Sequence, residues 1–226
     1  MRERSKMELN PNGTWLMSDE LMGSMIKDSE LFKRRKFRKD EEIYAQGSLS
    51  SKFYVVVSGL VQIAMIREDG TEVILELMGP QTVCGEGAAI DGLPRFSGAT
   101  ALEPTELLEF DAGKLPQIAA HSSEFVAAVL QVTALKQRVL AVRLEQLSSR
   151  EPETRILEMF GRMARMFAET RDDGKLIVPK LTHEQIAAMT GNTRVTVTRT
   201  LGRLKERGEI AIVDGRILLI SDRFRD

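Results

Sequence analysis

Between residues 38 and 111, short apolar runs alternate with glycine-containing turns. The expected strands are rich in β-branched and aromatic residues and cover residues 53–57, 60–66, 71–77 and 106–111. Residues 67–70 predict a hairpin turn, because Gly70 can adopt the positive φ that tight turns need. Many short strands at this spacing predict an all-β roll or barrel.

The pattern changes near Lys114, after which apolar residues recur at helical spacing. One stripe follows alternating steps of four and three residues, typical of a coiled-coil seam, and contains Val126, Leu130, Thr133, Gln137, Leu140, Leu144 and Leu147. A helix of about thirty residues would be about 45 Å long and would project past a roll of this size. We therefore expect its first turns to pack on the roll and the stripe to pair with a second copy of the chain.

A helix-turn-helix signature lies between residues 182 and 207. Thr182 is a good N-cap, and Gln185 follows three residues later, as in a capping box. The short helix 183–190 ends at Gly191, and Thr193 caps a second helix that is basic at its start. Such a second helix enters the DNA major groove by its N-terminal end. Residues 210–220 predict a small hairpin, the wing.

The second helix of this motif has distinct inner and outer faces. Val197, Leu201 and Leu204 recur at i, i+4 and i+7 and are expected to face the core. The candidate DNA-contacting residues are the two caps and the outward residues at the start of the helix, namely Thr182, Thr193, Arg194, Val195, Thr196, Thr198 and Arg199.

These elements predict an α+β chain with three parts. Residues 1–114 form the β-roll, to which the resemblance described below assigns the sensor role, residues 115–150 the dimerisation helix and hinge, and residues 151–226 the winged helix-turn-helix. The hinge is placed at residues 148–152, where two serines and a proline interrupt the helix. Pro152 suits the first turn of a new helix, which is expected to run to about Thr170.

Charge divides along the same boundary. The whole chain has a net charge of −1, but residues 1–149 hold 17 Lys and Arg against 21 Asp and Glu, a net of −4. Residues 150–226 hold 15 against 12, a net of +3. Residues 180–207 hold 6 Lys and Arg against 2 Asp and Glu, which indicates a localised surface for a polyanion such as DNA.

Several other kinds of chemistry have little support. One cysteine, Cys84, allows no internal disulfide and no iron–sulfur cluster, and it is expected to be a buried apolar residue. There is no metal-ligand spacing, phosphate loop or nucleophile–base pattern, so neither an enzyme nor a bound metal is expected. The N-terminus lacks a signal peptide and no apolar run reaches the length of a bilayer span, which favours a cytoplasmic protein without membrane contact.

Residues 181–204 resemble the recognition motif of the cyclic-AMP receptor/FNR superfamily of transcription regulators. The glycines at positions 47, 59, 70 and 79 and the run 85–95 are similar to the double-stranded β-roll and phosphate-binding cassette of that superfamily. The resemblance covers nearly the whole chain. It implies a sequence-specific regulator whose affinity for a near-palindromic operator is controlled by a small molecule in the roll. It also implies a homodimer, and contact with RNA polymerase if the regulator is an activator.

The resemblance assigns roles to the recognition helix. Arg199 corresponds to an arginine that reads guanine through O6 and N7. Arg194 is expected at a guanine or a phosphate, and Thr193 and Thr196 at phosphates. Most members carry glutamate where this chain has Val195, and the local run is closest to the nitrogen-control regulators. Valine can pack on a thymine methyl but cannot accept from cytosine N4, so a half-site other than TGTGA or TTGAT is expected.

The effector is less well defined. The candidate effector-binding residues come from the cassette and the long helix and are Gly85, Glu86, Gly87, Arg95, Phe96, Ser97, Thr133, Gln137 and Leu140. Cyclic-AMP-binding members have a hydroxyl residue where this chain has Phe96. Their adenine contacts fall near Leu140 and Ala141, which offer no side-chain hydrogen bond. These losses argue against cyclic AMP, and haem is not expected because His121 and His183 lie outside the roll.

Three questions stay open at this level. Arg95 either holds another small anion together with Lys136, Arg138 or Arg143, or forms a structural salt bridge to Glu86. The polar seam residues Thr133 and Gln137 either fix the helix register or face a ligand. The alternatives to an effector-controlled regulator are a constitutive DNA-binding regulator with a vestigial pocket, or a cyclic-nucleotide-binding regulatory module. The second alternative would lack a helix-turn-helix.

Overall fold

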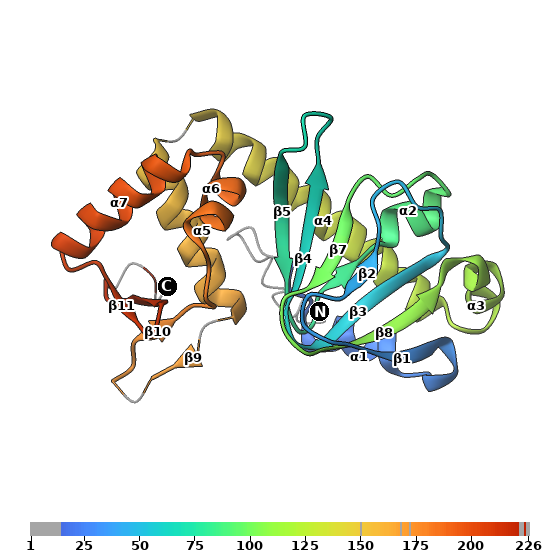
Figure 1. Cartoon of the computed structure of the whole chain (residues 1–226). Helices are drawn as coiled ribbons and strands as arrows, with labels where there is room; N and C mark the ends of the chain where they lie inside the picture. The colour runs from blue at the N-terminus through green and yellow to red at the C-terminus, as the bar shows by residue number, and fades with distance from the viewer. Residues whose placement is uncertain (1–14, 150, 168, 172, 222–223, 225–226) are drawn as a thin grey trace.

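The computed structural model describes residues 15–226 apart from 150, 168, 172, 222–223 and 225–226, and the side chains of residues 145–149 are outside the description. The strands of the roll form one lobe and a mostly helical domain forms the other (Figure 1). The long helix α4 (Ser123–Ser149) runs along the roll towards the helical domain. The expected α+β class is confirmed.

The roll consists of two four-stranded antiparallel sheets, β1-β8-β3-β6 and β2-β7-β4-β5. Its strands are β1 (Phe32–Phe37), β2 (Glu42–Tyr44), β3 (Lys52–Ser58), β4 (Val61–Ile66), β5 (Glu72–Met78), β6 (Val83–Cys84), β7 (Gly98–Ala101) and β8 (Thr105–Asp111). Its short helices are α1 (Asp19–Ile26), η1 (Ser29–Leu31), α2 (Glu86–Asp91), η2 (Ala112–Lys114) and α3 (Leu115–His121).

The strand predictions are correct for the apolar strands β3, β4, β5 and β8, and Gly70 has the positive φ of 82° that its turn requires. The pattern did not predict β1, β2, β6 or β7. β1 is a sheet edge whose four central residues are all basic and exposed, so it carries no apolar alternation. β2 and β6 have only three and two residues, which is too short for a periodic signal.

The helical segment after the roll differs from the single helix expected from about Lys114. It is divided at Ser122 into α3 and α4. In α4, Phe125, Val129 and Val132 are buried in the core of the roll, as expected for its first turns. By length and composition alone, Ser123–Leu144 could cross a membrane, with a mean hydropathy of 1.5, although no such stretch was expected. The mean hydropathy is high because α4 carries apolar residues both on the side that faces the roll and along the seam.

The C-terminal domain contains a helix-turn-helix and a small antiparallel sheet. Its elements are α5 (Pro152–Phe167), β9 (Glu169–Thr170), β10 (Leu176–Ile177), α6 (His183–Thr190), α7 (Arg194–Glu206), β11 (Ile210–Val213) and β12 (Arg216–Leu219). α5 ends at Phe167 rather than near Thr170, because the chain turns there into β9. The expected wing hairpin, β11–β12, is therefore part of a four-stranded sheet with the order β11-β12-β10-β9.

The two domains share one hydrophobic core. Leu60, Ile74 and Leu77 of the roll belong to the same buried cluster as the inner faces of α5, α6 and α7. The approach is close at Gly79, where an added Cβ would lie 2.3 Å from Cε1 of Phe167. β5 also lies directly against α6, so the helix-turn-helix packs on the sensor domain as well as being linked to it by α4 (Figure 1).

Candidate DNA-binding surface and effector cavity

The helix-turn-helix is fixed by local hydrogen bonds at both helix starts. The Thr182 hydroxyl accepts from the Gln185 amide at 3.1 Å, and the Gln185 side chain accepts from the Thr182 amide at 2.9 Å. The hydroxyl of Thr193 caps α7 by accepting from the Thr196 amide at 3.1 Å. Gly191 has the left-handed conformation, with φ 61°, that ends α6. These caps satisfy amides that a helix start leaves unpaired.

A residue of α5 holds the turn between the two helices. Arg155 donates to the Thr190 carbonyl at 2.8 Å and to the Asn192 side-chain oxygen at 2.7 Å. The turn is therefore anchored to the first helix of the domain. No sequence pattern around Arg155 links it to a turn 35 residues away, so this role could not be predicted.

The outward face of α7 agrees with the amphipathic prediction. Val197, Leu201 and Leu204 are buried, whereas Arg194, Thr198 and Arg199 are exposed. Val195 is 58% exposed and is therefore open to contact from outside the chain. Thr182 and Thr193 are exposed and Thr196 is half-buried. The structure thus places all seven candidates at the two helix starts and on one face.

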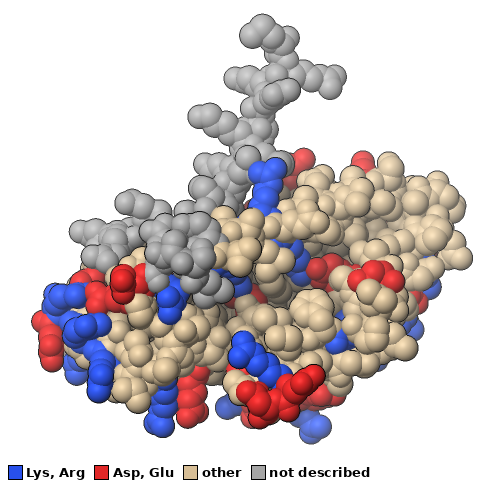
Figure 2. Space-filling model, turned by 90° about the horizontal axis from the view of Figure 1, so that it is seen from above, with Lys and Arg blue, Asp and Glu red and all other residues tan. Residues whose placement is uncertain are grey.

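Basic residues gather on this domain. Figure 2 shows Lys and Arg side chains clustered at the end of the molecule formed by the helix-turn-helix domain, with a smaller number of acidic groups among them. Arg194 lies 3.8 Å from Glu184, with both side chains at least 70% exposed. Such an exposed pair is weak and can be exchanged for contacts with a phosphate at little cost.

The seam of α4 is largely open in the single chain. Leu130, Leu140 and Leu144 are 66%, 55% and 70% exposed, and Gln137 is exposed beside them. Val126 and Thr133 are half-buried, and the side chain of Leu147 lies outside the described residues. An apolar stripe at heptad spacing, left uncovered by its own chain, fits the geometry of a helix that pairs with a second helix.

A cavity of about 700 Å³ lies between the roll, α4 and the helix-turn-helix domain. All nine candidate effector residues line it. They come from two distant segments, the cassette around α2 and the middle of α4, which the fold brings together. Lys136 and Arg143 also line the cavity, whereas Arg138 is exposed and lies outside it.

Arg95 is buried beneath the cassette and does not form the salt bridge to Glu86 that was one of its two expected roles. It donates to the carbonyl oxygens of Gly85 and Lys52 and stacks on the Tyr44 ring, with 4.0 Å between its guanidinium carbon and the ring centroid. Glu86 instead pairs with Lys136 at 2.7 Å, because α4 presents that ammonium group directly to the cassette. Among the described residues, no carboxylate lies within ion-pair distance of Arg95.

Gly85 makes the position of this arginine possible. A Cβ on Gly85 would lie 2.6 Å from Nη1 of Arg95, and the residue has a positive φ of 80°. Glycine is therefore required for two reasons, backbone conformation and the close approach of the guanidinium group.

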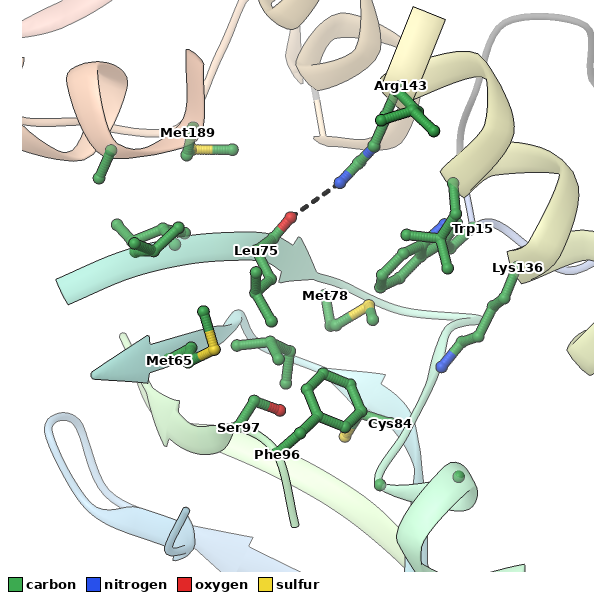
Figure 3. Close-up of a pocket in the computed structure, with 18 of the residues that line it drawn as sticks. Trp15, Met65, Leu75, Met78, Cys84, Phe96, Ser97, Lys136, Arg143 and Met189 are labelled. Carbon is green, nitrogen blue, oxygen red and sulfur yellow. Dashed lines mark hydrogen bonds between the residues drawn. The ribbon is translucent and has the colours of Figure 1, made fainter. Parts of the chain in front are cut away.

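A second ionic group lies deeper in the wall of the cavity. Arg143 of α4 donates to the Leu75 carbonyl at 2.8 Å and to the carboxylate of Glu76, which is fully buried (Figure 3). Trp15, from the segment before α1, lies beside Arg143 and Lys136, with 5.1 and 5.0 Å between each cationic group and its ring centroid. Sequence patterns missed Trp15, because no periodicity connects it to the roll or to α4.

The remaining candidate chemistry is unreactive. Burial raises the pKa of Cys84 to about 12, so its thiol stays protonated at neutral pH, as expected for a structural cysteine. In the part of the chain that the structure describes, no three His, Cys, Asp or Glu residues form a group that could hold a metal ion.

The fold and these two sites define a class of protein, a DNA-binding regulator with a small-molecule sensor domain. Residues 34–122 match the family model of the cyclic nucleotide-binding domain, and residues 161–225 match that of the Crp-like helix-turn-helix domain. The chain belongs to the CRP/FNR family of transcription regulators, whose members are effector-responsive DNA-binding proteins.

Two relatives and one solved structure illustrate the similarity of this chain to other members of the family. The CRP-like cAMP-activated global transcriptional regulator of Mycobacterium tuberculosis is 30% identical over 190 residues, 84% of each chain. The global nitrogen regulator of Nostoc sp. is 31% identical over 180 residues, 78% of this chain and 80% of the relative. The structure of FixK2 from Bradyrhizobium japonicum has a TM-score of 0.74 at 23% identity, covers 86% of this chain and 94% of that chain, and supports the fold.

Proposed function

We propose that the chain acts as a homodimer in the cytoplasm and reads a near-palindromic operator with the outward face of α7. A small molecule in the cavity controls its affinity for DNA. The observation that carries the proposal is the pair of sites in one chain: a capped, exposed basic helix and a 700 Å³ cavity lined by both domains. No enzymatic role is assigned, and contact with RNA polymerase is expected if the protein activates transcription.

The roles on α7 follow from side-chain chemistry and position. Arg199 supplies a bidentate donor pair for guanine O6 and N7, and Arg194 lies where it can reach a guanine or a phosphate. The caps Thr182 and Thr193, together with Thr196 and Thr198, are placed for phosphate contacts. Val195 packs on a thymine methyl, so the preferred half-site differs from those of relatives that carry glutamate there.

The dimer follows from the uncovered seam of α4. Pairing Leu130, Leu140 and Leu144 with the same residues of a second copy removes a continuous apolar stripe from water. A two-fold axis along α4 relates two recognition helices, and a spacing near 34 Å would let both enter successive major grooves on one side of the duplex.

Arg95 supports an effector with an acidic group. Its guanidinium is only 2% exposed and has carbonyl and aromatic partners, so its positive charge is not neutralised by a described carboxylate. Isolated buried charges are costly, and an anion at this end of the cavity would relieve that cost. Phe96 and Leu140 replace hydrogen-bonding partners that cyclic AMP would need, so another effector is favoured.

Selection from random DNA tests the proposal directly. Purified protein should enrich a two-fold repeated half-site with centres about one helical turn apart, and native mass spectrometry should show two chains per duplex. A ligand retained from the cell should change the affinity of the parent protein for the operator. Arg95→Gln should remove that change in affinity while leaving the dimer intact. Enrichment of a single, unrepeated site would contradict the dimer. Full operator affinity in ligand-free protein would favour the constitutive alternative.

A further inference from the structure

The cavity reaches beyond the sensor domain. Its far wall is the C-terminal half of α6, from Ala188 to Gly191, together with Arg155 and Arg162 of α5. Ile74 of β5 packs in the same cluster as Ala188 and Met189 of α6, whereas the Met65 and Leu75 side chains lie on the other face of β5 (Figure 3). A molecule that fills the space would therefore contact the helix immediately before the recognition helix as well as the roll and α4.

Most of the lining is apolar. Its apolar residues include Met65, Leu75 and Met78 of the roll, Leu140 of α4, and Ala188 and Met189 of α6. Three of them are methionines, whose flexible side chains adapt to irregular apolar ligands. The volume lies within the range of about 300–1,000 Å³ usual for small-molecule sites. A ligand that buries itself here needs an apolar body.

The charged lining is one-sided. Among the described residues, six Lys and Arg side chains line the cavity against two Glu side chains. Three buried nitrogens in its wall, Nε1 of Trp15 and Nε of Arg95 and of Arg143, have no hydrogen-bond acceptor in the described part of the chain. The Trp15 and Arg143 side chains lie against each other, with Lys136 on the same indole ring. Unpaired buried donors indicate that the missing group is an acceptor.

Resting on the function proposed above, we propose that the cavity binds an elongated amphipathic anion. Its acidic head group binds at the end of the cavity that holds Arg95 and accepts from the donors of Trp15, Lys136 and Arg143, and its apolar body extends along the cavity to Met189 of α6. The ligand thereby joins the sensor and the helix-turn-helix of the same chain directly. This contact supplements any change in how α4 meets its partner helix.

Trp15 provides the test, because it is the only tryptophan in the chain. Decanoate, a ten-carbon carboxylate, is titrated into the full-length protein below its micelle concentration while Trp15 fluorescence is recorded. Saturable binding is expected, at least tenfold tighter than that of three comparison probes. These are decyltrimethylammonium, which has the same tail and the opposite charge; butyrate, which has the charge and a short tail; and cyclic AMP.

Two variants test the reach to the DNA-binding domain. Met189→Gln places an amide in the apolar end of the cavity and should weaken decanoate binding by about tenfold, comparable to the loss of a good apolar contact in a pocket. Met166→Gln on α5 is the matched control, since Met166 is half-buried in the same domain but lies outside the cavity, and should leave affinity unchanged.

The outcomes separate this inference from the proposed function. Equal binding of the ammonium probe, tighter binding of butyrate or cyclic AMP, or an unchanged affinity in Met189→Gln would each overturn the inference. None of these results would affect recognition of a palindromic operator. Loss of palindromic selection with normal decanoate binding would instead remove the proposed function and leave the cavity assignment in place.

Discussion

The recognition face of α7 and the cavity are built in opposite ways. All seven candidate DNA contacts lie within 18 residues of sequence, on a surface held by two local caps. The cavity takes its walls from segments between Trp15 and Gly191, and only the fold brings them together. The first site is exposed and local, whereas the second is assembled from distant segments and shared between domains.

This difference predicts how the two regions respond to substitution. A change on the exposed face of α7 removes contacts with DNA and leaves the packing of the protein intact. A change in the cavity wall disturbs side chains that stabilise both domains, because the roll and the helix-turn-helix share one core.

Glu76→Ala should have the largest effect, on stability. The substitution leaves Arg143 buried without its carboxylate, and losing one partner of a buried pair costs about 3–5 kcal/mol. Denaturant unfolding should show this loss. The double variant Glu76→Leu with Arg143→Met removes both charges and should recover most of it. A single variant as stable as the parent would show that the pair does not stabilise the junction.

Leu130→Glu should next weaken the dimer. It places two like charges at the seam, where Leu130 is 66% exposed in the single chain and lies outside the cavity. Sedimentation should show at least a tenfold rise in the dimer dissociation constant, about 1.4 kcal/mol, with little change in chain stability. Gln131→Glu adds the same charge to an exposed position of α4 away from the seam and should leave the dimer unchanged. Equal effects of the two variants would argue against the seam.

Val195→Glu should change specificity rather than overall folding. The new carboxylate can accept from cytosine N4, so selection should shift towards G·C at the contacted pair, with about 1–3 kcal/mol of discrimination. Identical selected sequences for parent and variant would mean that Val195 does not face the bases. Unfolding curves of the two proteins should coincide, in contrast to Glu76→Ala.

The smallest effect concerns Asp111, which lies outside both regions. Hydrogen bonds from Lys52 at 2.6 Å and from Ser51 at 2.7 Å lower the pKa of Asp111 to about 2. The pKa of Asp111 in the folded state is below its value in the unfolded state. Its contribution to the free energy of unfolding is therefore present above about pH 4 and is lost as the pH falls towards 2. Because the pair is partly exposed, Asp111→Asn should cost less than about 1 kcal/mol at pH 7. Denaturant unfolding of the parent and of Asp111→Asn should show that the difference in their free energies of unfolding is largely lost at pH 2 compared with pH 7.

The same contrast explains what the sequence could predict. The helix-turn-helix was predicted with its caps and inner face because those features repeat over a few residues. The cassette residues and the middle of α4 were identified as effector candidates through resemblance and helical spacing. The pairing of Lys136 with Glu86, rather than Arg95 with Glu86, depends on where α4 crosses the cassette. Trp15, Glu76 and Met189 belong to the cavity or its wall only through tertiary packing, which no periodic pattern encodes.

The most direct test of the central claim is the affinity of the selected operator for the parent protein and for Arg199→Ala, at about 50 and 200 mM salt. The account predicts that the parent binds more weakly at the higher salt, and that Arg199→Ala loses about 1–3 kcal/mol and tolerates substitution at one base position. Arg171→Ala, an exposed arginine of the same domain away from α7, should bind as the parent does. Affinity that is independent of both salt and Arg199 would contradict the account.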